Sequence, residues 1–300
     1  MNRVTQHPVH AFAAALAAVA VLSIMDAVMK GLVLAIGIFA VSVWRSIANL
    51  VLTSGLYLPG RPKWPKAATL RIHVWRGIVV MVMAGLFFWG IGRVPLAQAI
   101  ALTFIAPLIS LLLASLFLHE QIGKKSIVGS IIAFTGVVAI VWGQARAQAA
   151  PGVLLGSAAI IGSALCYAVN IVLMRHQSLA AKPVEINFFQ SLTVLVLWFA
   201  AIPFVGFPVW PEGQWHWVVV AALMSTAGGL IFSWAYARAE ASYLSVTEYS
   251  GFLWASALGW LIFHERVSLY TLGGALLIVS GCLVAASRRT AVPPEIEATG

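Results

Sequence analysis

The sequence predicts an all-α polytopic membrane protein, with ten transmembrane helices in two inverted five-helix repeats and both termini in the cytoplasm. Three observations support this prediction. Hydrophobic residues make up 61% of the chain and charged residues only 9%, whereas a soluble domain carries roughly 25% charged residues. The apolar runs are about 18 to 24 residues long, enough to cross a hydrocarbon core of roughly 30 Å. The second half of the chain also repeats the first at a constant offset of 145 residues.

The repeat is clearest between residues 89 and 141, where it aligns residue types that seldom match by chance. Without a gap, it places Trp89 on Trp234, Arg93 on Arg238, His119-Glu120 on His264-Glu265, Gly129 on Gly274 and Gly136 on Gly281. An internal duplication of about half the chain predicts two units, residues 1–147 and 148–290. A short polar tail, 291–300, follows them.

Ten apolar runs give the expected helices, and turn signals such as Pro95, Pro151-Gly152 and Pro183 separate them. The first run has no clear cleavage site and has a repeat partner, so we expect a retained helix rather than a signal peptide. Cys166 and Cys282 fall inside runs and imply no disulfide framework. The expected helices span residues 11–32, 38–58, 71–91, 95–117, 124–143, 152–175, 184–206, 214–236, 241–263 and 269–287.

The lysines and arginines predict the orientation of these helices. With the N-terminus inside, twelve of the 18 basic residues fall in cytoplasmic segments, three fall outside and three lie within spans, namely Lys30, Arg45 and Arg76. This asymmetry favours cytoplasmic termini. It also explains the net charge of +9 without nucleic acid as a partner. Because five helices is an odd number, the second unit enters from the opposite side, and such inverted repeats are typical of transporters.

Ionisable side chains within spans are candidates for function because they are costly in hydrocarbon. Asp26 and Lys30 share one face of the first expected helix, and Arg45 lies on the second. They form either an ion pair or triad between these helices or a site that releases a charge to a substrate carboxylate or a proton. Glu248 lies mid-span, where it could accept a substrate ammonium or a coupled proton.

Glu120 and Glu265 each precede a helix, expected at 124–143 and 269–287, and a carboxylate there stabilises the positive helix end. No second histidine follows either His-Glu pair, as a zinc motif would require. We therefore expect capping from both glutamates. The spacing of Gly129 and Gly136, repeated in the second half, predicts close helix packing, either within the bundle or between protomers of a homodimer.

Neutral polar and aromatic residues gather on the fourth, sixth, eighth and ninth expected helices. Individually most of them could simply join helices, but together they favour a wet cavity lined by Gln98, Tyr167, Asn170, Ser245 and Tyr249. Tryptophan is frequent, with 12 residues. Trp89, Trp234 and Trp254 serve either as belt and packing residues or as cavity residues that stack on a planar substrate.

Two segments carry a resemblance to a known family. Residues 95–107, Pro-Leu-Ala-Gln-Ala-Ile-Ala-Leu-Thr-Phe-Ile-Ala-Pro, are followed by Leu-Phe-Leu-His-Glu at 116–120 and by Gly129 and Gly136. The second copy has Ile-Phe-His-Glu at 262–265 and Gly274 and Gly281. Both resemble the EamA-type unit of the drug/metabolite transporter superfamily, over nearly the whole chain. Within it, the chain is most similar to bacterial aromatic amino acid exporters.

The sequence therefore predicts a secondary transporter of the bacterial inner membrane, not an enzyme. The resemblance implies export of small amphipathic metabolites, aromatic amino acids above all, through a central cavity. No Walker A sequence is present, so we expect no cofactor and a substrate or ion gradient as the energy source. The alternatives are a broad drug or organic-cation exporter, for which Glu248 supplies a cation trap, a phosphate-ester carrier, with Arg45 as its basic candidate, and a membrane-embedded enzyme.

Overall fold

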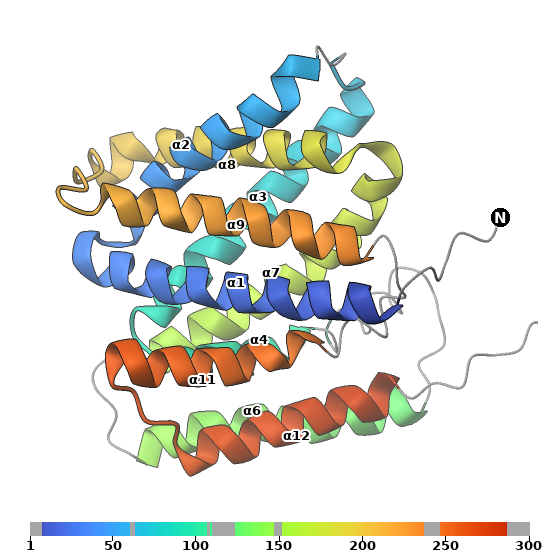
Figure 1. Cartoon of the computed structure of the whole chain (residues 1–300). Helices are drawn as coiled ribbons and strands as arrows, with labels where there is room; N and C mark the ends of the chain where they lie inside the picture. The colour runs from blue at the N-terminus through green and yellow to red at the C-terminus, as the bar shows by residue number, and fades with distance from the viewer. Residues whose placement is uncertain are drawn as a thin grey trace, which may run out of the picture.

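The computed structural model describes residues 8–60, 64–106, 109, 124–146, 152–236 and 247–286. Every regular element in these ranges is a helix, as Figure 1 shows. The helices are α1 (Pro8–Ile36), α2 (Ile38–Tyr57), α3 (Ala67–Ile91), α4 (Leu96–Thr103), α6 (Lys124–Arg146), α7 (Val153–Ala180), α8 (Pro183–Val205), α9 (Trp215–Tyr236), α11 (Ser250–Phe263) and α12 (Leu269–Ala286), with a short 3-10 helix η1 (Leu58–Gly60).

Eight of the expected helices agree with the observed ones to within a few residues at their described ends. The helices expected at 95–117 and 241–263 are instead interrupted by turns at 104–105 and 249, so α4 ends at Thr103 and α11 begins at Ser250. The break between the first two lies at Gly37, whose φ of 79° is open to glycine but strained for other residues. Six described helices are long and apolar enough to cross a membrane, and three shorter apolar helices accompany them. A polytopic helical membrane protein is thereby confirmed, while the count of ten crossings and the cytoplasmic termini stay predictions.

The helices pack in pairs that are exchanged between the two halves of the chain. Taken in order, α1, α2, α3, α4 and α6 of the first half correspond to α7, α8, α9, α11 and α12 of the second. In the structure α3 packs on α7 as α9 packs on α1, and α3 packs on α8 as α9 packs on α2. The pairs α2–α8, α4–α11 and α6–α12 join corresponding helices directly. This pattern arises because each half packs against the other through corresponding helices.

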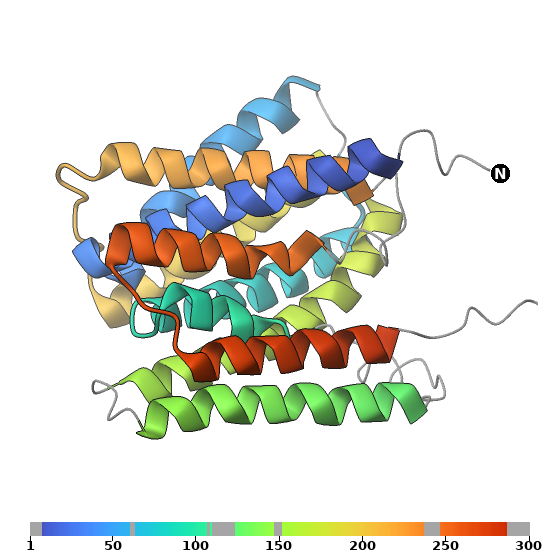
Figure 2. The ribbon, with the colours of Figure 1, turned by 60° about the horizontal axis from the view of Figure 1, so that its bottom comes forward.

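The α6–α12 pair forms one edge of the bundle, visible at the bottom of Figure 1 and in front in Figure 2. A Cβ on Gly136 would lie 2.5 Å from the carbonyl oxygen of Gly274, and one on Gly274 would lie 2.6 Å from that of Gly136. Only glycine allows the backbones this close. The close packing predicted for the repeated glycines therefore occurs within the chain.

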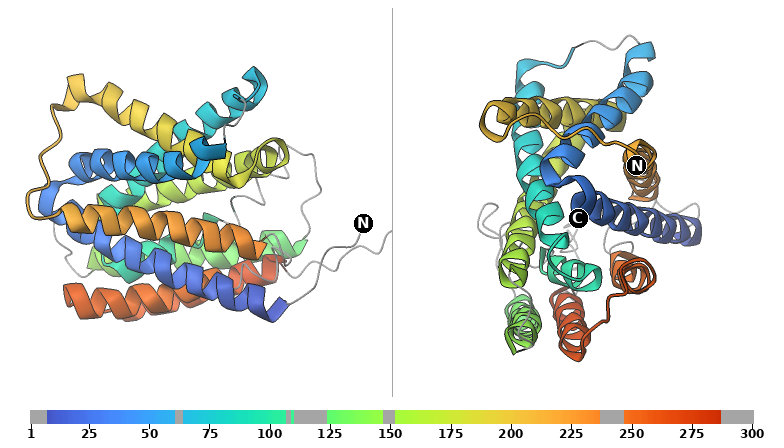
Figure 3. Two further views of the ribbon diagram at one scale, coloured as in Figure 1. Left: turned by 45° about the horizontal axis from the view of Figure 1, so that its top comes forward. Right: turned by 90° about the vertical axis from the view of Figure 1, so that its left-hand side faces the viewer.

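Polar and apolar side chains are distributed as a lipid environment requires. Large apolar side chains lie on the outside, among them Phe204, which is 90% exposed, and Leu253, which is 69% exposed. Lys30, Arg45 and Arg76 are buried instead. The end-on view in Figure 3 shows α1, α3 and α7 between the α6–α12 edge and the α2–α8 pair. Charged groups held inside such a bundle are the first place to search for function.

Candidate functional site

Among the described residues, three cations lie in the interior, one on each of the first three helices. Lys30 is 4% exposed, Arg45 9% and Arg76 8%. A buried charge is stable only when nearby groups compensate it. The partners of these three side chains therefore show which of them are structural and which remain available to a ligand.

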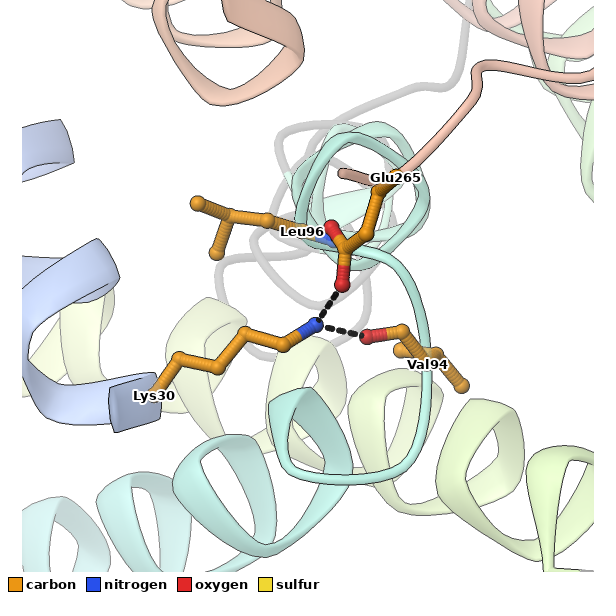
Figure 4. Close-up of polar contacts among 4 residues, drawn as sticks. All are labelled: Lys30, Val94, Leu96 and Glu265. Carbon is orange, nitrogen blue, oxygen red and sulfur yellow. Dashed lines mark hydrogen bonds and ion pairs between the residues drawn. The ribbon is translucent and has the colours of Figure 1, made fainter. Parts of the chain in front are cut away.

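Lys30 on α1 pairs with Glu265, which follows α11, as Figure 4 shows. Its Nζ also donates to the carbonyl oxygen of Val94 at 2.6 Å. The second carboxylate oxygen of Glu265 accepts a hydrogen bond from the backbone N–H of Leu96 at 2.8 Å. This Lys30–Glu265 cluster joins α1, the α3–α4 connection and the end of α11, so it links both halves at one end of the bundle.

Two expectations differ from this geometry. The partner of Lys30 is Glu265 and not Asp26, so these three charges do not form the triad that was one reading of the sequence. Glu265 lies at a positive helix end as expected, but the helix is α4 and not α12. Capping by Glu120 concerns a residue outside the described part of the chain.

Local backbone geometry places the Glu265 carboxylate. His264 has a φ of 55°, in the left-handed region that ends helices. Its conformation turns the chain so that the Glu265 N–H donates to the Gly259 carbonyl at 3.0 Å. A Cβ on Gly259 would lie 2.8 Å from a Glu265 carboxylate oxygen, so glycine leaves the space that this carboxylate needs.

Arg45 on α2 and Asp26 on α1 are coupled electrostatically, since each charge acts on the other. The Arg45 guanidinium also lies over the Phe88 ring, 5.2 Å from its centroid, a favourable arrangement for a cation. The ion pair expected between the first two helices stays a prediction for these two residues.

Arg76 on α3 has neutral neighbours instead. Its Nε donates to Asn170 Oδ1 at 2.9 Å, and its Nη1 donates to Gln177 Oε1. Among the described residues, no carboxylate pairs with it and the side chain that acts on its charge is Tyr167. Behind it, Gln177 Nε2 contacts His73 Nδ1, and His73 Nε2 lies 3.3 Å from Glu185 Oε1.

Two of the predicted cavity residues, Tyr167 and Asn170, lie on one face of α7 beside Arg76. Glu248, just before α11, is close enough for its charge to act on the Tyr167 hydroxyl. Tyr167 and Asp26 are both half-buried. The structure thus brings Arg76, Tyr167, Asn170 and Glu248 together in the interior, and we call these four residues the central cluster.

The other predicted site residues lie elsewhere. Gln98 is buried and donates to Ser157 Oγ at 3.2 Å, which joins α4 to α7. Tyr249 packs edge-on against Phe104, with 5.2 Å between ring centroids. The guanidinium of Arg93 stacks on Trp89 at 3.6 Å from the ring centroid. Trp234 and Trp254 are each 43% exposed, and Ser245 is outside the described residues.

Arg76 is the member of the central cluster that the sequence prediction missed. The sequence places Arg76 within a span, but the charge pattern assigns it no role beyond that. His73 and Arg76 are three residues apart on α3, and Asn170 and Gln177 are seven apart on α7, so each pair shares a helix face. Two polar faces on long apolar helices were the available signal, although the sequence does not show that they meet.

Comparison with known families decides the class of the protein. The model of the EamA-like transporter family matches twice, at residues 10–142 and 154–287. The chain belongs to the EamA-like transporter family. Its members are transporters and not enzymes, and this chain is accordingly a multi-pass protein of the bacterial inner membrane that exports small molecules.

Curated relatives differ in what they carry. The chain is 24% identical over 219 residues to the pseudopaline exporter CntI of Pseudomonas aeruginosa, covering 69% of this chain and 72% of the relative. It is 32% identical over 163 residues to a probable terminal-alkyne amino-acid exporter of Streptantibioticus cattleyicolor, covering 53% of this chain and 52% of the relative. It is 27% identical over 225 residues to a riboflavin transporter of Rhizobium johnstonii, covering 72% of both chains.

Proposed function

We propose that this EamA-like protein is a secondary transporter that exports small amphipathic metabolites, foremost aromatic amino acids, by alternating access through a central cavity. The observation that carries the proposal is the central cluster. Its residues come from α3 of the first half and from α7 and the segment just before α11 in the second. A substrate bound there contacts both halves and can couple its movement to theirs.

The chemistry of the cluster suits an aromatic amino acid. The Tyr167 ring offers a face on which a planar side chain can stack. The Glu248 carboxylate next to it carries the charge that attracts an ammonium group, and the Asn170 amide offers hydrogen bonds. A site of this kind, apolar and aromatic with few polar groups, is typical of small-molecule binding.

Alternating access requires that each end of the bundle can close. The Lys30–Glu265 cluster closes one end by connecting α1, the α3–α4 connection and the end of α11. In the predicted topology this is the periplasmic end. The predicted inversion of the two halves supports a mechanism in which the ends open in turn.

The relatives support export and a zwitterionic or aromatic cargo. One is named an amino-acid exporter, and another exports pseudopaline. The riboflavin transporter shows that a relative carries a planar ring system. The alternative of an organic-cation exporter is less favoured, because the buried positive charge of Arg76 repels cations in the cluster.

A homodimer stays a prediction that the glycine spacing no longer supports. The glycine faces of α6 and α12 are occupied by each other, so two protomers would meet through a different surface.

Counterflow in proteoliposomes tests the proposed function. Vesicles loaded with unlabelled tryptophan or phenylalanine are assayed for uptake of labelled phenylalanine, tryptophan and threonine, with and without a pH gradient. We expect saturable exchange of the aromatic amino acids. The Glu248→Gln variant should lose the response to pH if this carboxylate carries a coupled proton. Exchange of organic cations without exchange of any amino acid would contradict the proposal.

A further inference from the structure

We propose that Arg76 is the residue that binds the carboxylate of the substrate, held in position by Asn170 and Gln177. The inference rests on the proposed function, since it assigns the carboxylate end of the substrate to a residue of the same site.

Arg76 differs from the other two interior cations in the groups that surround its charge. Lys30 has the carboxylate of Glu265 in direct contact, and Arg45 has the charge of Asp26 acting on it. Arg76 is equally buried, but its hydrogen-bond partners among the described residues are amide oxygens. Amides align a guanidinium without neutralising it. A buried cation in such surroundings is stabilised most by an anion that arrives as a ligand.

The hydrogen bonds of Arg76 also fix its direction. Arginine only donates, so Gln177 must turn its oxygen toward Arg76 and its NH₂ toward His73. His73 Nδ1 must then accept, which places the imidazole proton on Nε2, facing Glu185. This chain from α3 through α7 to α8 supports the guanidinium from behind.

The remaining donors of Arg76 are open to a ligand. Nη2 makes no hydrogen bond to the described residues. It is also not one of the fully buried polar atoms that lack a hydrogen-bond partner. The nearby Tyr167 is partly accessible. A planar carboxylate matches a guanidinium edge through two parallel charge-assisted hydrogen bonds. The arrangement therefore selects substrates with a carboxylate over otherwise equal substrates that lack one.

The test compares matched ligand pairs in wild type, Arg76→Gln and Asn170→Asp. Phenylalanine is compared with phenylalaninamide in counterflow, and 3-phenylpropionate with 3-phenylpropanamide in ligand-induced thermal stabilisation of the purified protein. In each pair, one ligand carries a carboxylate and the other has a neutral amide in its place. Arg71→Gln is the control, because this exposed arginine lies on the same helix.

Wild type and Arg71→Gln should prefer the carboxylate of each pair. Arg76→Gln should weaken binding of the carboxylate ligand by about 30- to 100-fold, the contribution of a hydrogen-bonded charge pair. Binding of the amide ligand should change by less than about twofold. Asn170→Asp gives Arg76 a permanent carboxylate partner, so it should keep the fold and also lose the preference. A merely structural role for Arg76 predicts the opposite for Asn170→Asp, namely unchanged ligand preference.

The two assays separate this inference from the proposed function. Wild type that exchanges no amino acid but is stabilised by 3-phenylpropionate in an Arg76-dependent manner contradicts the amino-acid proposal and supports the role of Arg76. Amino-acid exchange with the same carboxylate preference in Arg76→Gln as in wild type overturns the inference and leaves the proposed function standing.

Discussion

Replacing Lys30 by methionine should open the end of the bundle that the Lys30–Glu265 cluster closes. Methionine keeps the length and apolar stem of the side chain but removes the ammonium group. Glu265 then loses its ion pair and keeps the hydrogen bond from the Leu96 N–H. With the contact between the two halves weakened, the open arrangement of this end gains population.

The expected magnitude follows from the burial of the pair. Removing one partner of a fully buried ion pair costs about 3–5 kcal/mol. The Glu265 side chain is 18% exposed and keeps one hydrogen bond, so we expect about 2 kcal/mol here. At about 1.4 kcal/mol per factor of ten, the open population should rise roughly 30-fold.

Cysteine labelling measures this population. Ala97, in the first turn of α4, is 4% exposed and serves as the reporter when replaced by cysteine, after Cys166 and Cys282 have been changed to serine. A membrane-impermeant maleimide should modify it roughly 30-fold faster with Lys30→Met, because labelling follows the open fraction. Val267→Cys, on the exposed connection after Glu265, should react equally in both backgrounds. A lower melting temperature with unchanged labelling at position 97 would mean that the cluster is only structural.

Three further predictions concern packing, the support of Arg76 and the tryptophans. Gly274→Leu should abolish folding of the α6–α12 edge and give little monodisperse protein in size-exclusion chromatography, whereas Gly273→Ala, with nothing within 4 Å of its Cβ, should behave as wild type. Gln177→Met removes the amide oxygen that aligns the Arg76 guanidinium, so phenylalanine binding should weaken several-fold without being abolished, which thermal stabilisation by the ligand measures. Trp234→Leu and Trp254→Leu should change exchange rates less than about twofold, because both rings are 43% exposed and we predict that they form part of the belt at the membrane surface; a large loss in either would place that ring in the transport path.

Helix positions were predictable because the chain marks its breaks. Pro95, Pro183 and Gly37 end or begin helices in the structure at the places where they interrupt apolar runs. Length and hydrophobicity then determine the rest, since a span must satisfy its own backbone hydrogen bonds in lipid. The first helix extends beyond its predicted end, to Ile36, because an apolar sequence has no polar signal to stop it.

The site was less predictable because its contacts join distant residues. Capping rules compare a glutamate with the helix that follows it, yet Glu265 accepts the N–H of Leu96, 169 positions away. Asn170 and Tyr167 were expected in the cavity from their spacing on one helix. Their proximity to Arg76 depends on which face of α3 meets α7, and a single sequence does not contain that information.

A structure of the protein with bound phenylalanine tests the central claim most directly. The account predicts the substrate in the central cluster, with its carboxylate within hydrogen-bonding distance of Arg76, its ammonium toward Glu248 and its ring against Tyr167. Phenylalanine bound away from these residues, with Arg76 still held only by Asn170 and Gln177, would contradict it.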